Sequence, residues 1–313
     1  MRHHRDQPGR ERFEHFSTRL FSDQGEESSF EGGTAISRRK VLVGSSSAIL
    51  TAATTTINPQ SAWSALISAD STELGVGLLE SRVTENILSP PPYRMEGTDI
   101  FYPSWFNGAW NVRSETVSIE APCGVALFGG NATYNAALAD VGNVLQYQSR
   151  FLKDPTGNNP NKVIADREYN VKSIAKVAMG ENSVVDVSMA TPNKFSCLLA
   201  PKGAPSMLSV DLLVLNRRAE DMTDENRFDC AEVVREIASP VDSPKARLSP
   251  ILKEIETTSL YTYDPVKDIV TCQQRSAAFL LPSNENPMAM KMWQASRGRA
   301  IDVRFYKVTY TRA

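Results

Sequence analysis

The densest group of ionisable side chains inside an apolar stretch of this sequence is Asp166-Arg167-Glu168-Tyr169. If the stretch is a strand, Asp166 and Glu168 point to one face, and Arg167 and Tyr169 point to the other. At the mouth of a barrel, the two carboxyl groups could work as a general acid and a general base. The competing interpretation is a cross-strand salt bridge with an outward-facing pair. We favour it, because perturbed ionisable groups often belong to structural ion networks.

Histidine chemistry is confined to the start of the chain. The three histidines, His3, His4 and His15, all lie before residue 37. The long remainder therefore offers no Ser-His-Asp triad, no Cys-His pair, no histidine zinc site and no histidine pH switch. We predict no catalytic residues and no metal site. An enzyme here would have to use carboxylates, Tyr, Lys or Cys.

The cysteines are widely spaced and lack the C-x-x-C pattern, which argues against a metal site or a thioredoxin-like redox centre. In an exported protein they could form one or two disulfides, for which three full pairings exist. Alternatively, they are small buried apolar residues. The four positions are Cys123, Cys197, Cys230 and Cys272.

Two aromatic groups are candidate contacts for a ligand or a partner protein. Tyr102, Trp105 and Phe106, with Trp110 close behind, could receive a flat apolar ligand or could fill one end of a barrel. Trp293 lies in the methionine-rich segment PMAMKMWQ. This segment could form an adaptable surface for a partner, or a hairpin loop that packs on the barrel.

Residues 37–64 have the features of a cleaved twin-arginine export signal. Arg38 and Arg39 precede a weakly apolar run, and the small residues Ala62 and Ser64 stand where a signal peptidase reads the chain. The run is short and rich in Ser and Thr, whereas a membrane span needs about 20 apolar residues. We therefore predict a mature form without a transmembrane segment.

The export signal begins unusually deep in the chain. We interpret residues 1–36 as a poorly defined leader or transit segment and expect it to be disordered, although its acidic residues are atypical of transit peptides. A leader in front of a twin-arginine signal suggests two-stage targeting into a plastid and then into the thylakoid lumen. The bacterial periplasm is the alternative location.

After the signal, the sequence changes from helical to β character. Residues 66–95 have the pattern of a helical lead and a Pro-rich linker, because Leu and Val recur at helical spacing before Pro90-Pro91-Pro92. In residues 96–313, short β-branched and aromatic runs alternate with Gly, Pro, Asn and Asp. We predict strands near 110–120, 144–152, 163–179, 184–190, 195–199, 207–218, 231–237, 252–263, 268–281 and 300–310. The fold class is mainly β: a single antiparallel barrel of about eight to ten strands with a short N-terminal helix.

Gly108-Ala109-Trp110, followed directly by a strand, resembles the G-x-W opening of lipocalin-like barrels. The resemblance implies that Gly108 lets the chain turn across the closed end and that Trp110 plugs it. It also implies that an arginine of the last strand covers the Trp ring, and we assign that part to Arg304. A cation–π contact of this kind contributes about 1–2 kcal/mol when water is excluded. The alternative is that Trp110 is an ordinary core residue and Arg304 a solvated charge.

Residues 86–313 are similar to a family of cyanobacterial and plastid proteins catalogued as a domain of unknown function, number 6816. The segments that carry the likeness are NILSPPPYRMEGTDIFYPSWFNGAW, VIADREYNVKSIAKVAMG and RAIDVRFYKVTYTR. The resemblance implies a position in or at the thylakoid. It supplies no reaction and no catalytic residues.

Two hypotheses about function follow. The first is a non-catalytic thylakoid lumen protein that binds a small apolar ligand, such as a pigment, quinone or lipid, in its barrel. The alternative is an accessory or assembly factor for a photosynthetic membrane complex, with a packed barrel. A histidine-free enzyme acting on a lipid or carotenoid is a weaker alternative. The net charge of −2 gives no reason to expect a nucleic-acid partner.

Overall fold

The computed structural model describes residues 77–157, 160–200, 207–222, 225–241, 251–283 and 286–313, all within one unit of the chain. The predicted leader, the export signal with Arg38 and Arg39, and the first part of the predicted helical lead lie outside the described residues. The described part is mainly β, as predicted, and its strands all pair antiparallel.

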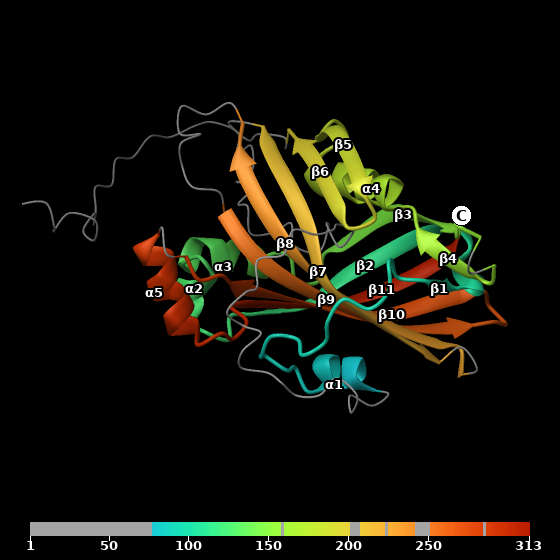
Figure 1. Cartoon of the computed structure of the whole chain (residues 1–313), viewed down its shortest axis with the longest axis horizontal. Coiled ribbons are helices and arrows are strands. Elements are labelled where there is room, and N and C mark those ends of the chain that lie inside the picture. Colours follow the sequence, from blue (N-terminus) through green and yellow to red (C-terminus); the bar gives the residue numbers. More distant parts are fainter. Residues whose placement is uncertain (1–76, 158–159, 201–206, 223–224, 242–250, 284–285) are drawn as a thin grey trace, which may run out of the picture. The chain divides into compact units, whose positions relative to one another are not determined.

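Eleven strands form one sheet that curls into a half-barrel (Figure 1). Their order across the sheet is β1-β4-β3-β2-β11-β10-β9-β8-β7-β6-β5, so the last strand of the chain pairs with β2 in the middle. The strands are β1 (Tyr102–Pro103), β2 (Gly108–Glu120), β3 (Val144–Lys153), β4 (Lys162–Ala165), β5 (Val184–Thr191), β6 (Lys194–Leu199), β7 (Leu208–Met222), β8 (Arg227–Pro240), β9 (Ile251–Asp264), β10 (Ile269–Leu280) and β11 (Asp302–Arg312).

Short helices cover parts of the sheet. They are α1 (Leu78–Thr84), the 3-10 turn η2 (Ser104–Phe106), α2 (Val125–Phe128), α3 (Asn131–Leu138), α4 (Arg167–Met179) and α5 (Pro287–Ser296). The helix α1 agrees with the predicted N-terminal helix. The interior helices were not predicted, and α5 replaces the predicted hairpin loop around Trp293. Asn286 caps α5 by accepting hydrogen bonds from the backbone N–H groups of Met288 and Ala289, and Pro287 supplies a favourable first residue.

The predicted strand 163–179 is wrong beyond Ala165, because residues 167–179 form α4. Its buried residues Val171, Ile174, Ala175 and Met179 recur with the period of a helix rather than of a strand. The Asp166 side chain caps the first turn, and Gly180 follows the last residue with φ 114°. The cap residue, the helical spacing and the terminal glycine can all be read from the sequence. The apolar content of the segment nevertheless made it resemble a strand.

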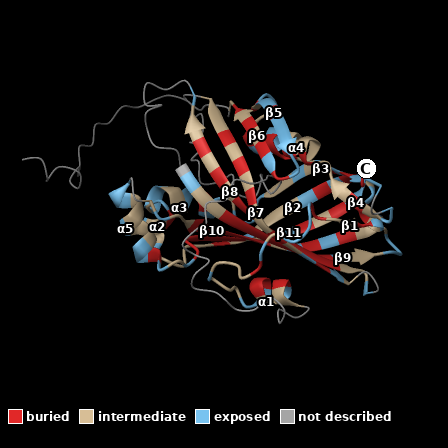
Figure 2. Cartoon of the chain, viewed as in Figure 1, coloured by how far each residue is buried: buried red, intermediate tan, exposed pale blue. Residues whose placement is uncertain are grey.

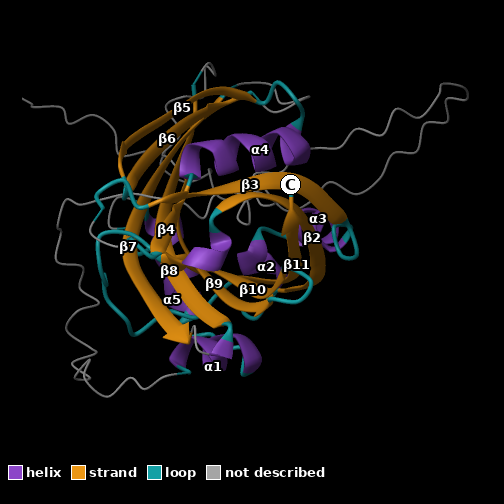
Figure 3. Cartoon of the chain, turned by 90° about the vertical axis from the view of Figure 1, so that its right-hand side faces the viewer, coloured by secondary structure: helices purple, strands orange, loops and turns teal. Residues whose placement is uncertain are grey.

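Helix α4 lies between the two ends of the curled sheet. It contacts β3 near one end and β5 at the other (Figure 3). Its apolar face joins a core formed with β5, β6, β7 and β8. A second, aromatic core fills the space enclosed by β2, β3 and β8–β11. Buried residues accordingly line the middle of the long strands, while exposed residues concentrate at α5, α3, β5 and the strand ends (Figure 2).

Candidate functional site

Trp110 lies near the start of β2 and is completely buried. Gly108 has φ 108°, which favours glycine, where the chain turns into β2. The indole Nε1 of Trp110 donates a hydrogen bond to the carbonyl oxygen of Phe106 over 2.7 Å. Trp110 is therefore held against the turn that leads into β2.

Arg312, and not Arg304, covers the Trp110 ring. The Arg312 guanidinium carbon lies 3.9 Å from the ring centroid. The same side chain donates to the carbonyl oxygens of Asn107 (2.6 Å) and Trp105 (3.0 Å), which ties the entering loop to β11. The prediction named the correct strand but the wrong residue. In the register between β11 and β2, Arg312 lies opposite Trp110, whereas Arg304 lies opposite Ile119. Eight residues of strand separate the two arginines by about 27 Å.

Arg304 lies at the opposite end of β11. It forms an ion pair with Asp302 over 2.8 Å and lies 5.8 Å from the ring centroid of Phe128 in α2. It is buried rather than solvated.

The predicted aromatic patch packs against other aromatic rings instead of forming an open platform. Tyr102 and Phe106 contact each other edge-on at 5.1 Å between ring centroids, and Trp105 stacks on Tyr263 at 5.0 Å. Phe106 is fully buried and joins the aromatic core. Of the predicted contacts in this group, Tyr102 is the one that also lines the interior cavity described below.

The four residues Asp166 to Tyr169 do not form one site, because they start a helix rather than continue a strand. Asp166 caps α4 and pairs with Arg150, while Glu168 pairs with Lys172 at the surface. The Tyr169 hydroxyl donates to the Gln148 side chain over 2.8 Å. These three residues therefore make structural contacts outside the barrel.

Arg167 instead points inwards and joins a buried ion cluster between the two cores. Its guanidinium makes two 3.0 Å hydrogen bonds to the Glu232 carboxylate and pairs with Asp99. Arg217 of β7 approaches the same Glu232 carboxylate at 3.1 Å. Burial alone would raise the pKa of Glu232, but the two arginines outweigh it and hold that pKa below its ordinary value.

An interior cavity of about 110 Å³ adjoins Glu232. Its wall combines hydroxyl, amide and aromatic groups drawn from β1, β3, α4 and β8–β11. The polar members are Tyr102, Tyr147, Ser149, Asn170, Cys230, Glu232, Thr257, Ser259, Tyr261, Gln274 and Tyr310. Burial raises the pKa of all four tyrosines, so their hydroxyls remain neutral hydrogen-bond donors.

Sequence reasoning missed most of this wall. The available signal was polar residues at alternate positions within apolar strands: Thr257 and Ser259 in β9, and Gln274 in β10. Residues two apart share a face of the sheet, so each of these polar groups shares the face of a core residue such as Tyr261 or Cys272. The Gln274 amide donates to Ser259 over 3.1 Å across that face.

The four cysteines are free thiols in this structure, and Cys197, Cys230 and Cys272 are buried, which agrees with the alternative of small buried apolar residues. Burial raises the pKa of Cys197 to about 12 and raises those of Cys230 and Cys272 as well. Protonated thiols are poor nucleophiles and poor metal ligands. Cys123 is half-buried and lies 3.3 Å from the carbonyl oxygen of Ala300.

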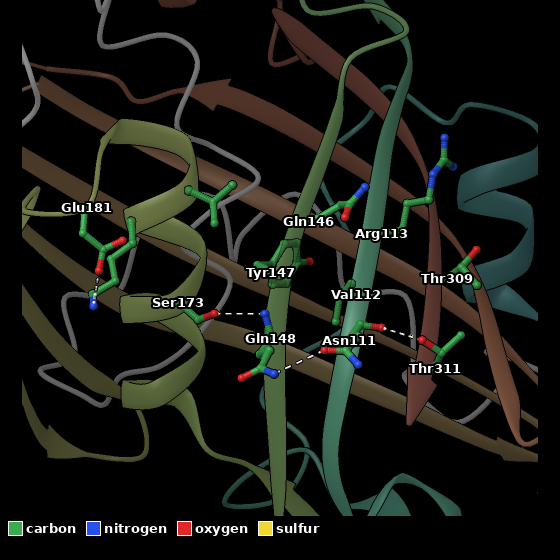
Figure 4. Close-up of a pocket in the computed structure, with 12 residues that line it drawn as sticks. Asn111, Val112, Arg113, Gln146, Tyr147, Gln148, Ser173, Glu181, Thr309 and Thr311 are labelled. Atoms are coloured by element: carbon green, nitrogen blue, oxygen red, sulfur yellow. Dashed lines mark hydrogen bonds and ion pairs between the residues drawn. The ribbon is translucent and has the colours of Figure 1, made fainter. Parts of the chain in front are cut away.

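A larger groove of about 640 Å³ lies on the other side of β3 (Figure 4). Its floor is the outer face of β2, β3 and β11, and one wall is α4. Asn111, Gln148 and Thr311 line the floor and are linked by hydrogen bonds. None of the residues proposed from sequence lies in this groove.

The predicted partner surface around Trp293 is a helix, α5, that contacts β10. Trp293 is half-buried, whereas Met288 is exposed. Within the described ranges, no helix has the length and apolarity to cross a membrane, and no three His, Cys, Asp or Glu side chains are grouped to hold a metal ion.

A family model described as a domain of unknown function (DUF6816) matches residues 96–313. The chain belongs to this family. No curated protein and no solved structure matches the chain. The matched region contains the whole sheet, Trp110 and the interior cavity, while α1 lies before it.

Proposed function

We propose that this DUF6816 protein is a non-catalytic binding protein that holds a small molecule in the interior cavity of its half-barrel. The observation that carries the proposal is the character of that cavity. It is lined by residues of both cores, and it presents neutral hydroxyl and amide groups beside a buried carboxylate. Convergent polar groups in an otherwise apolar interior are typical of small-molecule sites.

The cavity size narrows the ligand class. Pockets for larger ligands typically measure about 300–1,000 Å³. A cavity of about 110 Å³ has no room for a carotenoid or a tetrapyrrole. We therefore replace the expected pigment or lipid by a compact amphipathic molecule with hydroxyl or carbonyl groups. The hydroxyls of Tyr102, Tyr261 and Ser259 are its expected hydrogen-bond partners.

A pair of variants tests this proposal. Ser149→Leu places an apolar side chain in the cavity wall, whereas Gln148→Leu changes the adjacent outward-facing residue of β3. Each protein is purified after incubation with a plastid or cyanobacterial extract, denatured, and analysed for released small molecules by mass spectrometry. We expect one molecule released from the wild type and from Gln148→Leu, but not from Ser149→Leu. Equal release from all three proteins, or none from the wild type, contradicts the proposal.

We also propose the thylakoid lumen as the location, supported by the pair Arg38-Arg39 before an apolar run. Import into isolated plastids tests it. The wild type should reach the lumen and lose its N-terminal segment, and Arg38→Lys/Arg39→Lys should stop in the stroma. A double variant that still reaches the lumen removes this support.

An accessory factor for a photosynthetic membrane complex is the second candidate. The observation that favours it is that two packed cores leave little of the barrel interior empty. Co-purification with a photosystem subunit from thylakoid membranes would support this candidate. Recovery of the protein only in the free lumenal fraction would count against it.

A further inference from the structure

Helix α4 supplies hydrogen-bond partners to one edge of β3. The Asn170 side chain accepts from the backbone N–H of Arg150 over 2.7 Å and donates to its carbonyl oxygen over 3.2 Å. One turn later, the Ser173 hydroxyl accepts from the N–H of Gln148 over 3.0 Å. These side chains replace a neighbouring strand, because β4 pairs only with residues 151–153 of β3.

At the next turn, α4 no longer supplies a hydrogen-bond partner to β3. Residues 170, 173 and 177 lie on one face of the helix, and the third is Val177, which has no hydrogen-bonding side chain. Residues two apart in a strand direct their N–H and C=O groups to the same edge, so Gln146 follows Gln148 and Arg150. The backbone of Gln146 therefore faces the groove between α4 and β3, which it lines together with Val177.

The charges around this groove are already paired. Lys176 forms an ion pair with Glu181 over 2.9 Å, and Arg113 forms one with Glu115 over 2.9 Å. The remaining lining combines amide and hydroxyl side chains, as Figure 4 shows for Asn111, Gln148 and Thr311, with the apolar side chains of Val112 and Val177. The groove thus matches an occupant without net charge that has its own backbone donors and acceptors.

We propose that this groove is a strand-addition site that binds an extended, uncharged segment of a partner protein against the Gln146 edge of β3. Strand addition gains affinity from main-chain hydrogen bonds, and side-chain contacts provide selectivity. Gln148 lies beside this edge and is placed to contact a side chain of the added segment, whereas Asn111 and Thr311 lie on the more distant strands β2 and β11. The site is separate from the interior cavity and does not depend on a ligand there.

The open edge is tested first by amide hydrogen exchange on the full chain. We expect the N–H of Gln146 to exchange at least about tenfold faster than those of Gln148 and Arg150. Val177→Asn supplies the missing acceptor, so it should slow the exchange at Gln146, whereas Val177→Ala should leave the exchange fast. Equal protection of the three amides in the wild type overturns the proposal.

Binding is tested with uncharged octapeptides selected by display on the folded wild type and then synthesised. We expect a peptide that protects the Gln146 amide, loses at least about tenfold in affinity when its alternate backbone nitrogens are methylated, and weakens similarly on Val177→Asn but not on Val177→Ala. Failure to select such a peptide, or binding that tolerates methylation, overturns the proposal. Protection of Gln146 by a neutral oligosaccharide and not by peptides also overturns it.

Discussion

At the scale of single residues, the position of a side chain along its strand determines which groups it contacts. Arg304 and Arg312 lie on the same face of β11, yet one pairs with Asp302 and the other covers Trp110. Asp229 is a further case: it is fully buried, and among the described residues its Oδ1 atom has no hydrogen-bond partner. Both observations lead to predictions about stability.

Arg312→Gln should lower the free energy of unfolding by about 1–2 kcal/mol, because it removes the cation–π contact and weakens the hydrogen bonds to the entering loop. The side chain is partly exposed, which limits the loss. Urea unfolding followed by circular dichroism measures it. Arg113→Gln, an exposed arginine on β2, is the control and should change little. An equal loss in both variants would contradict the role assigned to Arg312.

Asp229→Asn should make stability less dependent on pH. Burial raises the pKa of Asp229 to about 6, which Arg227 only partly opposes. Because this pKa lies above that of the unfolded chain, the folded protein binds the proton more tightly, and stability falls as pH rises from about 4 to about 6. The loss amounts to about 2–3 kcal/mol.

The variant should therefore be more stable than the wild type near pH 7 and about equally stable near pH 4, as measured by urea unfolding at both values. If Asp229→Asn were destabilising by the same amount at both pH values, the raised pKa would not be the cause.

At the scale of elements, α4 takes the place of further strand pairing between the ends of the sheet. It begins at Asp166, whose side chain accepts from the N–H of Tyr169 and pairs with Arg150. The same residue that suggested acid–base chemistry therefore works as a helix cap. This cap matters for stability because α4 carries Val171, Ile174 and Ala175, which pack in the core.

Asp166→Ala should cost about 1–2 kcal/mol of unfolding free energy, because one cap and one ion pair are lost. Glu168→Ala is the matched control, since it removes only an exposed pair with Lys172 that contributes about 0.3–0.5 kcal/mol. Thermal unfolding of both variants distinguishes them. A larger shift for Glu168→Ala would contradict the capping role.

At the scale of the whole molecule, residues before the family-matched region complete the domain. Arg82 of α1 binds the buried Glu256 of β9 over 2.5 Å, and Arg275 of β10 approaches the same carboxylate at 3.4 Å. The Tyr93 hydroxyl donates to Glu256 over 2.7 Å. Residues 77–95 are therefore packed structure on the outer face of the sheet, whereas the sequence suggested a lead and a linker.

A fragment of residues 96–313 should be about 3–5 kcal/mol less stable than residues 77–313, because it loses the burial of Leu79, Val83 and Tyr93 and leaves Glu256 without its partners Arg82 and Tyr93. Urea unfolding of the two fragments measures the difference. Within residues 77–313, Glu80→Ala on the exposed side of α1 should have little effect. Equal stability of the two fragments would show that the lead is dispensable.

The sequence alone determined most of the strands, since alternation and turn residues act over a few positions, and nine of the ten predicted strands lie within observed ones or overlap them closely. It also determined that a glycine and a tryptophan stand at the entrance to β2. Tertiary structure alone decided which arginine reaches Trp110, because the β2–β11 register fixes that contact. It also decided that Arg167 and Glu232, 65 residues apart, share a buried ion cluster. Periodicity along the chain specifies which face of a strand or helix each residue occupies. The partners of that residue across the barrel depend on how the sheet curls.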